Sequence, residues 1–209
     1  MNRFERALYK APGLFVTGTD TDIGKTVLAA CLTLGLDADY WKPIQSGQDD
    51  ATDSQRLAQW LDPSRILPER YLLRQPMSPN QAAERDGVTI GLQDFRLPAS
   101  SRKVIVEGAG GVMVPLNRRH TMLDLMVHLN LPVVLAARSG LGTLNHSLLS
   151  LQALRARGLE PLAVVLLGDA HPDNRRDVAL FGRIEVLALP WLEPLTASSL
   201  TQAFHHLSS

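Results

Sequence analysis

The sequence predicts an α/β fold, a single domain in which a parallel β-sheet carries helices on both of its faces. Short apolar runs alternate with helix-like patterns along the whole chain, and this alternation is typical of repeated strand–helix–strand units. Apolar residues make up 45% of the 209 residues and aromatic residues only 5%, which suits a sheet packed with Val, Leu and Ala. Polar or glycine-rich segments follow several of the apolar runs, where ligands bind in such folds.

Each expected element has a local reason. The expected strands are short apolar runs, and they cover residues 13–17, 39–43, 102–107, 132–136, 162–167 and 184–188. Helix starts are marked by Thr52-Asp53, Thr121 and Thr143, and Gly158 marks a helix end. The expected helices cover residues 24–35, 52–61, 121–129, 143–157, 173–180 and 196–206.

The segment 62–101 differs from the rest, because it holds five prolines and little periodicity. We expect loops and short helices there, lying over one face of the sheet. The sequence contains no repeat and no convincing linker. We therefore expect one domain over residues 1–209.

Charge and cysteine content bear on location and partners. Lys plus Arg and Asp plus Glu both number 21, so the formal charge is zero and neither nucleic acid nor a membrane is indicated as a partner. The single cysteine, Cys31, lies in an apolar run and fits a reducing compartment, so we expect a cytoplasmic protein. The first thirteen residues lack the apolar core of a signal peptide. No run approaches the length of a membrane span.

The segment 18–26, GTDTDIGKT, follows an apolar run and precedes a predicted helix. Such a loop can cradle phosphates with its backbone N–H groups, and the positive end of the helix points to the same place. Lys25 would reach the β- and γ-phosphates of a nucleotide, and Thr26 would ligate Mg²⁺. Five residues separate Gly18 from Gly24, one more than the usual pattern, and the alternative is a plain strand-to-helix turn. We expect a P-loop NTPase-like sheet that binds nucleotide through Gly18, Thr19, Asp22, Ile23, Gly24, Lys25, Thr26 and Val27.

Glu107 follows a predicted strand and opens the segment EGAGG. An acid at the tip of a buried strand can hold Mg²⁺, directly or through water, and the alternative is a capping glutamate before a flexible turn. Glycines at positions 108, 110 and 111 would let the backbone approach a ligand closely. The phosphate loop elsewhere in the chain favours the metal.

Three further polar residues lie at or after the end of the second predicted strand. Lys42 and Ser46 would emerge at the edge of the sheet where ligands bind, although most lysines are solvated surface residues. Asp53 starts the next helix, where it would be either an N-cap or a third ligand of Mg²⁺. A second glycine-rich turn, residues 139–145, would suit a carboxylate or phosphate at its helix start, and the alternative is an ordinary connection.

Taken together, the motifs resemble the dethiobiotin synthetase family. The matching segments are GTDTDIGKT (18–26), YWKPIQSG (40–47), VEGAGG with Pro115-Leu116 (106–116), LGTLNH (141–146) and PWL (190–192). They occur in family order and span nearly the whole chain. The phosphate loop is shared by many ATPases, whereas its combination with the segments at 42–47 and 107–111 is far more specific.

The resemblance implies a ligase of biotin biosynthesis that uses ATP and Mg²⁺. Its substrates would be 7,8-diaminononanoate and carbon dioxide, and its product dethiobiotin, formed through a carbamate and a carbamic-phosphoric anhydride. The family is a homodimer, in which the turn at 141–145 of one subunit caps the substrate carboxylate bound by the other.

The resemblance also implies a role for individual residues. Lys25 and Lys42 would stabilise phosphoryl transfer, with Thr21 and Asp22 beside the reacting centre. The implied Mg²⁺ ligands are Thr26, Asp53 and Glu107. The further implied nucleotide-binding residues are Gly108, Gly110, Gly111, Gly168, Asp169, Pro190, Trp191 and Leu192. The implied substrate-binding residues are Lys42, Ser46, Gly110, Leu141, Gly142, Thr143, Leu144 and Asn145.

The chain departs from the family pattern at three places. Gly168-Asp169 stands where the family commonly has Asn-Asp reading the adenine base, and residues 26–39 and 88–101 are shorter than usual. Two other interpretations remain open. One is a nucleotide-switch protein like the partition ATPases, although those carry an additional lysine early in the loop. The other is a catalytically silent module, which should lack the acids at positions 53 and 107.

Overall fold

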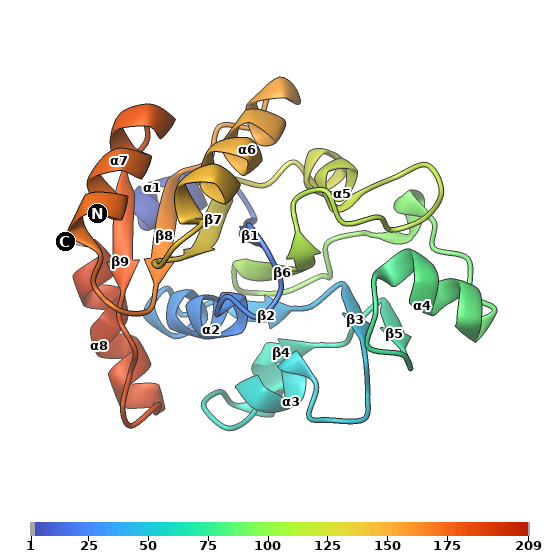
Figure 1. Ribbon diagram of the computed structural model, residues 1–209. Coiled ribbons are helices and arrows are strands. Elements are labelled where there is room, and N and C mark those ends of the chain that lie inside the picture. Colours follow the sequence, from blue (N-terminus) through green and yellow to red (C-terminus); the bar gives the residue numbers. More distant parts are fainter. Residues whose placement is uncertain (1–2, 209) are drawn as a thin grey trace.

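The computed structural model describes residues 3–208 and is built around a parallel sheet of seven strands (Figure 1). The strands lie in the order β4-β2-β6-β1-β7-β8-β9, and each neighbouring pair is parallel. Their bounds are β1 (Gly13–Gly18), β2 (Asp39–Trp41), β4 (Ile66–Leu67), β6 (Val104–Gly111), β7 (Val133–Arg138), β8 (Ala163–Leu167) and β9 (Val186–Leu189). A second parallel pair consists of β3 (Ile44–Ser46) and β5 (Tyr71–Leu73). The predicted α/β class is confirmed.

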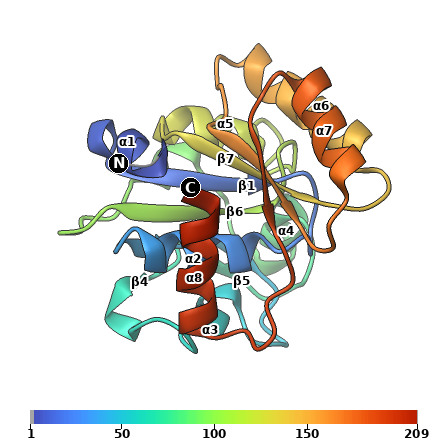
Figure 2. The same ribbon diagram turned by 90° about the vertical axis from the view of Figure 1, so that its left-hand side faces the viewer.

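Helices cover both faces of the main sheet. On one face α2 (Lys25–Gly35) packs against α8 (Ala197–Ser208), and on the other lie α5 (Met122–Leu129), α6 (Thr143–Ala156) and α7 (Pro172–Gly182) (Figure 1 and Figure 2). The remaining helices are α1 (Arg3–Lys10), α3 (Asp53–Leu57), α4 (Pro79–Asp86) and the 3₁₀ turns η1 (Pro63–Arg65) and η2 (Leu92–Asp94). Within residues 3–208, no helix has both the length and the apolar character that crossing a membrane requires.

Two apolar layers result from the alternation of side chains along each strand. Leu14 and Val16 of β1 belong to the layer beneath α2 and α8, whereas Phe15 belongs to the layer beneath α5 and α6. The same alternation places Ile105 with the first layer and Val106 with the second. Both layers are buried, so the central strands consist almost entirely of apolar residues.

The two ends of the described chain meet on the α2 face. Gly35 lies so close to α8 that a Cβ atom there would be 2.0 Å from the ring of Phe204. The Phe4 ring of α1 lies 6.3 Å from the Phe204 ring, centroid to centroid. Residues about two hundred positions apart therefore close the same apolar layer.

Several elements differ from the sequence-based prediction. The segment 62–101 contains β4, which is the edge strand of the main sheet, and β5, which pairs with β3. Both are very short, and prolines at 63 and 68 flank β4, so neither has a detectable periodicity. The helix predicted over 52–61 ends at Leu57, and α1 was not predicted.

The end of β6 also differs. The strand continues to Gly111, so Glu107 lies within it and not at its tip. Gly18 pairs with Gly111 across a register shift between β1 and β6. A Cβ atom at Gly111 would lie 3.1 Å from the backbone oxygen of Thr19, so the phosphate loop lies directly on the end of β6 and leaves little room for a side chain there. The carboxyl ends of β1, β2, β6 and β7 thus meet at one edge of the sheet.

Candidate active site

The loop between β1 and α2 has the strand–loop–helix geometry of a phosphate-binding loop. Gly24 is the N-cap of α2 and has a φ of 92°, a left-handed conformation that favours glycine. A Cβ atom at Gly18 would lie 2.8 Å from the Ile23 side chain, so the loop folds tightly over itself. The first turn of α2 points its N–H groups into this loop, as an anion site requires.

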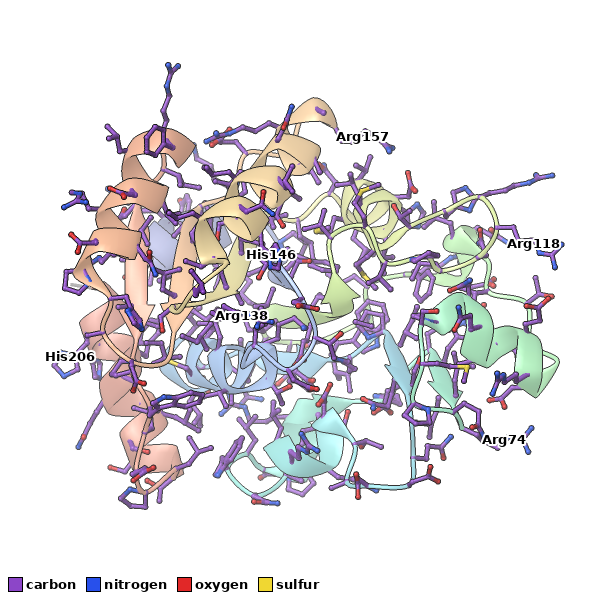
Figure 3. All side chains as sticks on the ribbon, viewed as in Figure 1. Arg74, Arg118, Arg138, His146, Arg157 and His206 are labelled. Carbon is purple, nitrogen blue, oxygen red and sulfur yellow. The ribbon has the colours of Figure 1, made fainter. Side chains whose placement is uncertain are left out.

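The lysine of the loop is held by the loop itself. Lys25 is buried, and its Nζ donates to the backbone oxygen of Asp20 at 2.6 Å. The carboxylate of Asp20 accepts a hydrogen bond at 2.9 Å from Arg138, the last residue of β7, which is labelled in Figure 3. Burial and the nearby ammonium of Lys42 lower the pKa of Lys25, against the opposing effect of Glu107 and Asp53. A bound phosphate would place negative charge next to the Lys25 ammonium and so stabilise its protonated form.

Beside the loop lies a cluster of Thr26, Lys42, Asp53 and Glu107, here called the acid–lysine cluster. Lys42 is buried, and its Nζ lies 2.5 Å from Asp53 Oδ2 and 2.9 Å from Glu107 Oε1. The Thr26 hydroxyl donates to the same Glu107 oxygen at 3.0 Å. The four side chains come from α2, the end of β2, α3 and β6, so the fold alone brings them together.

Electrostatic interactions hold Lys42 and Asp53 of this cluster in their charged forms. Burial by itself lowers the pKa of Lys42, but the carboxylates of Glu107 and Asp53 outweigh it and raise that pKa above its ordinary value. Burial likewise acts to raise the pKa of Asp53, yet the Lys42 ammonium and the Thr26 hydroxyl hold it below its ordinary value. The lysine stays protonated and the aspartate ionised at neutral pH.

The structure also decides between the sequence-based interpretations of these residues. Lys42 is not a solvated surface lysine, because only 4% of its surface is exposed. Asp53 is not an N-cap, because Thr52 caps α3 through a capping box with Gln55. Glu107 is not a cap before a turn, since it lies within β6.

One member of the site was missed from the sequence. Tyr40 lies in β2, is fully buried, and donates its hydroxyl to Glu107 Oε2 at 2.8 Å. Its position next to Trp41 in an apolar run suggested a core side chain. The only available signal was the two-residue spacing from Lys42, which places both side chains on one face of a strand.

The donor set of the acid–lysine cluster fits a divalent cation. It consists of two carboxylates and a hydroxyl, all oxygen atoms, which Mg²⁺ prefers. Within residues 3–208 no three His, Cys, Asp or Glu side chains gather as a metal site of their own. A cation here would therefore complete its shell with water or with phosphate oxygens, as Mg²⁺ usually does.

Other predicted residues lie around the cluster. A Cβ atom at Gly110 would be 3.5 Å from the hydroxyl of Thr21, so the phosphate loop and the end of β6 adjoin. Ser46 ends β3, and its buried Oγ has no hydrogen-bond partner among residues 3–208. Thr21 and Asp22 are exposed in the loop, Asp22 with a φ of 54°.

The second glycine-rich turn starts α6. Gly142 is its N-cap with a φ of 91°, and Leu141 is fully exposed while Thr143 is buried against Ser147. Asn145 is also exposed. Leaving the Leu141 side chain in water costs free energy, and so this turn would gain stability if another surface covered it.

The predicted base-binding residues lie together at the ends of β8 and β9. Gly168 has a φ of 113°, and a Cβ atom there would be 3.0 Å from Ser139 Oγ and 3.5 Å from the ring of Trp191. A cavity of about 550 Å³ between α7 and these strands reaches Gly168 and Asp169 but no residue of the phosphate loop. The acid–lysine cluster, not this cavity, is therefore the centre of the candidate chemistry.

The fold and the site together define a P-loop nucleotide-binding protein. The family model described as an AAA domain matches residues 12–199. The ATP-dependent dethiobiotin synthetase of Nitrobacter hamburgensis is 50% identical over 194 residues, covering 91% of this chain and 92% of that protein. The enzyme of the same name from Rhodopseudomonas palustris strain TIE-1 is 52% identical over 195 residues, covering 91% and 92%. The chain belongs to the dethiobiotin synthetase family.

A solved structure supports the fold alone. A ParA family ATPase from Chlorobium tepidum superposes with a TM-score of 0.50 at 13% identity, covering 95% of this chain and 90% of that one. At this identity the likeness extends to the parallel sheet and not to the activity.

Replacing Lys42 with Met should lower the free energy of unfolding by about 3–5 kcal/mol at pH 7, because the buried carboxylate of Glu107 and the partly buried carboxylate of Asp53 lose their shared cation. Lys42 holds the pKa of Asp53 below its unfolded value of 3.8, so this stabilisation is present above that value and lost as the pH falls. In the variant, burial alone raises the pKa of Asp53, and protonation then relieves the repulsion. The difference from wild type should therefore shrink between pH 7 and pH 4.5, measured by urea denaturation.

A matched control is Lys103→Met, since Lys103 is an exposed lysine at the opposite end of β6. Its free energy of unfolding should stay close to that of the wild type at each pH. A Lys42→Met deficit that is independent of pH would contradict the assigned charge state of the cluster.

Proposed function

We propose that this protein is an ATP-dependent dethiobiotin synthetase, a ligase that forms C–N bonds in biotin biosynthesis. The observation that carries the proposal is the buried Lys42 held by Asp53 and Glu107 beside the phosphate loop. The relatives that share about half of its residues over nine tenths of its length have that name.

The proposed reaction closes a five-membered urea ring. One amine of 7,8-diaminononanoate attacks carbon dioxide to give a carbamate. A carbamate oxygen attacks the γ-phosphorus of ATP, and ADP leaves. The second amine attacks the carbonyl carbon of the mixed anhydride, phosphate leaves, and dethiobiotin remains. The phosphoryl step requires positioning and charge neutralisation more than covalent chemistry by the protein.

The charged residues suit this reaction. Lys25 and Lys42 would oppose the negative charge that is shared between ATP and the carbamate, and both are buried, where a charge acts most strongly. Thr21 and Asp22 are exposed in the loop and would lie beside the reacting groups. Ser46, with an unpaired buried hydroxyl, would hydrogen-bond the carbamate.

The proposed residues for the remaining groups follow from their places in the fold. Mg²⁺ would be held by Thr26, Asp53 and Glu107, where it would neutralise phosphate charge. The triphosphate would lie on the loop at 18–27 and on the glycines at 108, 110 and 111. The base would lie between 168–169 and 190–192, and the substrate would contact Lys42, Ser46, Gly110 and the turn at 141–145. We also propose a single domain and a cytoplasmic location, the latter because of the lone buried cysteine.

A homodimer is part of the proposal. Leu141 is completely exposed at the start of α6, and residues 141–145 would cap the carboxylate of the diamine bound by the partner subunit. The alternatives are a nucleotide-switch ATPase and a catalytically silent module. The phosphate loop holds no lysine before Lys25, which argues against the switch ATPase. Asp53 and Glu107 are both present and both form ion pairs with Lys42, which argues against the silent module.

Single-turnover phosphate release from ATP tests the function. The rate should depend on both the diamine and bicarbonate, whereas a switch ATPase would be indifferent to them. Glu107→Gln and Lys42→Ala should each lower the rate by about a hundredfold or more, because each removes a preorganised electrostatic group. Lys103→Ala, which changes the exposed lysine just before β6, should retain wild-type rates. Diamine-independent phosphate release, or full activity in a folded Glu107→Gln variant, would rule the assignment out.

The dimer has its own test. The wild type should sediment at twice the mass of one chain. Leu141→Asp should shift it toward the monomer, because a charge replaces an apolar contact, and should raise KM for the diamine. Leu180→Asp, an equally simple change at an exposed leucine of α7, serves as the control. A fully active monomer would exclude the shared site.

Base selectivity is expected to be relaxed. An asparagine amide reads adenine by two hydrogen bonds, worth about 1–3 kcal/mol of discrimination, and Gly168 has no side chain to do so. Asp169 can only accept when ionised, and the exocyclic amines of adenine and cytosine both offer a donor. We expect CTP to compete with ATP in kcat/KM measurements, and Asp169→Ala to reduce the use of both.

Gly168→Asn is a poor test of this idea, since the φ of 113° and the close Ser139 hydroxyl would strain any side chain. A wild type that prefers ATP over CTP and GTP by about a thousandfold or more would show that backbone groups near Pro190 read adenine unaided.

A further inference from the structure

The two carboxylate oxygens of Glu107 have separate surroundings. Oε1 accepts from Lys42 at 2.9 Å and from Thr26 at 3.0 Å, so it faces the acid–lysine cluster. Oε2 accepts from the hydroxyl of Tyr40 at 2.8 Å, and Tyr40 belongs to the apolar layer beneath α2 and α8. The carboxylate is therefore fixed at both ends, and its two oxygens are not interchangeable.

Tyr40 and Lys42 contact different oxygen atoms of Glu107. Tyr40 lies in β2 and pairs in register with Ile105, two residues before Glu107, and its hydroxyl donates to Glu107 Oε2, whereas Lys42 follows the last residue of β2 and donates to Oε1. Tyr40 has no exposed surface, and Glu107 has 1%. No water can therefore replace the Tyr40 hydroxyl without repacking of the apolar layer around it.

This hydrogen bond is costly to remove. A bond from a hydroxyl to a buried carboxylate is charge-assisted, and a carboxylate oxygen left alone in such a place is costly. The Tyr40 side chain is fully buried in the apolar layer beneath α2 and α8, so its hydroxyl is held in this position. Removing it would free Oε2 and let the carboxylate turn toward Lys42.

We propose that Tyr40 is a positioning residue that occupies Glu107 Oε2 and thereby presents Oε1 to the divalent cation and the phosphates. The inference rests on the proposed function, in which Glu107 holds the cation. Without the hydroxyl, Glu107 would pair with Lys42 through both oxygens, and the cation would compete with a tighter internal ion pair. Residues behind a metal ligand typically change metal affinity by about 10–100-fold.

The test is the metal dependence of nucleotide binding. Binding of the β,γ-imido analogue of ATP is measured by calorimetry with Mg²⁺ and with EDTA. The dissociation constant in EDTA divided by that in Mg²⁺ reports how strongly the metal strengthens nucleotide binding. Tyr40→Phe keeps the ring and removes one oxygen atom. We expect it to lower this ratio by about tenfold while binding in EDTA stays unchanged.

Tyr71→Phe is the matched control. Tyr71 is also buried and also donates its hydroxyl to a carboxylate, Asp94 Oδ2 at 2.6 Å, but it lies in β5 away from the cluster. Its loss removes the same chemical group, so the ratio should stay within about twofold of the wild type.

The outcomes separate the inference from the proposed function. If Glu107→Gln leaves the ratio unchanged, Glu107 does not hold the metal and that part of the proposed function fails. If Glu107→Gln lowers the ratio but Tyr40→Phe does not, the inference alone is wrong. Equal weakening by Tyr40→Phe with Mg²⁺ and with EDTA would mean a structural role only, and would also overturn it.

A double variant covers the case in which Tyr40→Phe does not fold. In Tyr40→Phe with Glu107→Gln the buried partner is a neutral amide, which tolerates an unpaired position better than a carboxylate. If Tyr40 acts through Glu107, the double variant and Glu107→Gln have the same ratio. A further fall in the double variant would show that Tyr40 acts elsewhere, and the proposal would be rejected.

Discussion

The site depends on one ammonium group, that of Lys42, placed between the buried carboxyl group of Glu107 and the partly buried one of Asp53. A buried lysine is stable only where acidic groups pair with its charge, so Lys42 and its two partners depend on one another. The three residues belong to segments that are far apart in the sequence, so this contact joins α3, β2 and β6 as well as holding the charges. The phosphate loop then lies against this charged group through Thr26.

The parts of the site that were predictable follow directly from local pattern. GTDTDIGKT after an apolar run is sufficient to predict the strand, the loop and the helix, and the structure has β1, the loop and α2 there. Lys42 and Glu107 were predictable because parallel strands end at a common edge. The sequence predicted too few strands, because β4 has only two residues and is recognised as a strand only through its pairing with β2.

What could not be predicted is set by contacts between distant residues. Tyr40 reads as core, and nothing in its neighbourhood reveals that its hydroxyl reaches Glu107, sixty-seven positions later. The bond between Lys25 and the Asp20 carbonyl is likewise a property of the folded loop. The glycine at 168 was noticed only for the side chain it lacks, whereas the structure shows that its backbone conformation also requires glycine.

The packing of α8 over α2 has a consequence for how the chain is made. The apolar face of α2, including the groove at Gly35, is complete only when Phe204 of the last helix arrives. During synthesis this face therefore stays uncovered until α8 has been made, long after α2 itself. A chain truncated before α8 would leave the apolar face of α2 exposed to water and would be prone to aggregate.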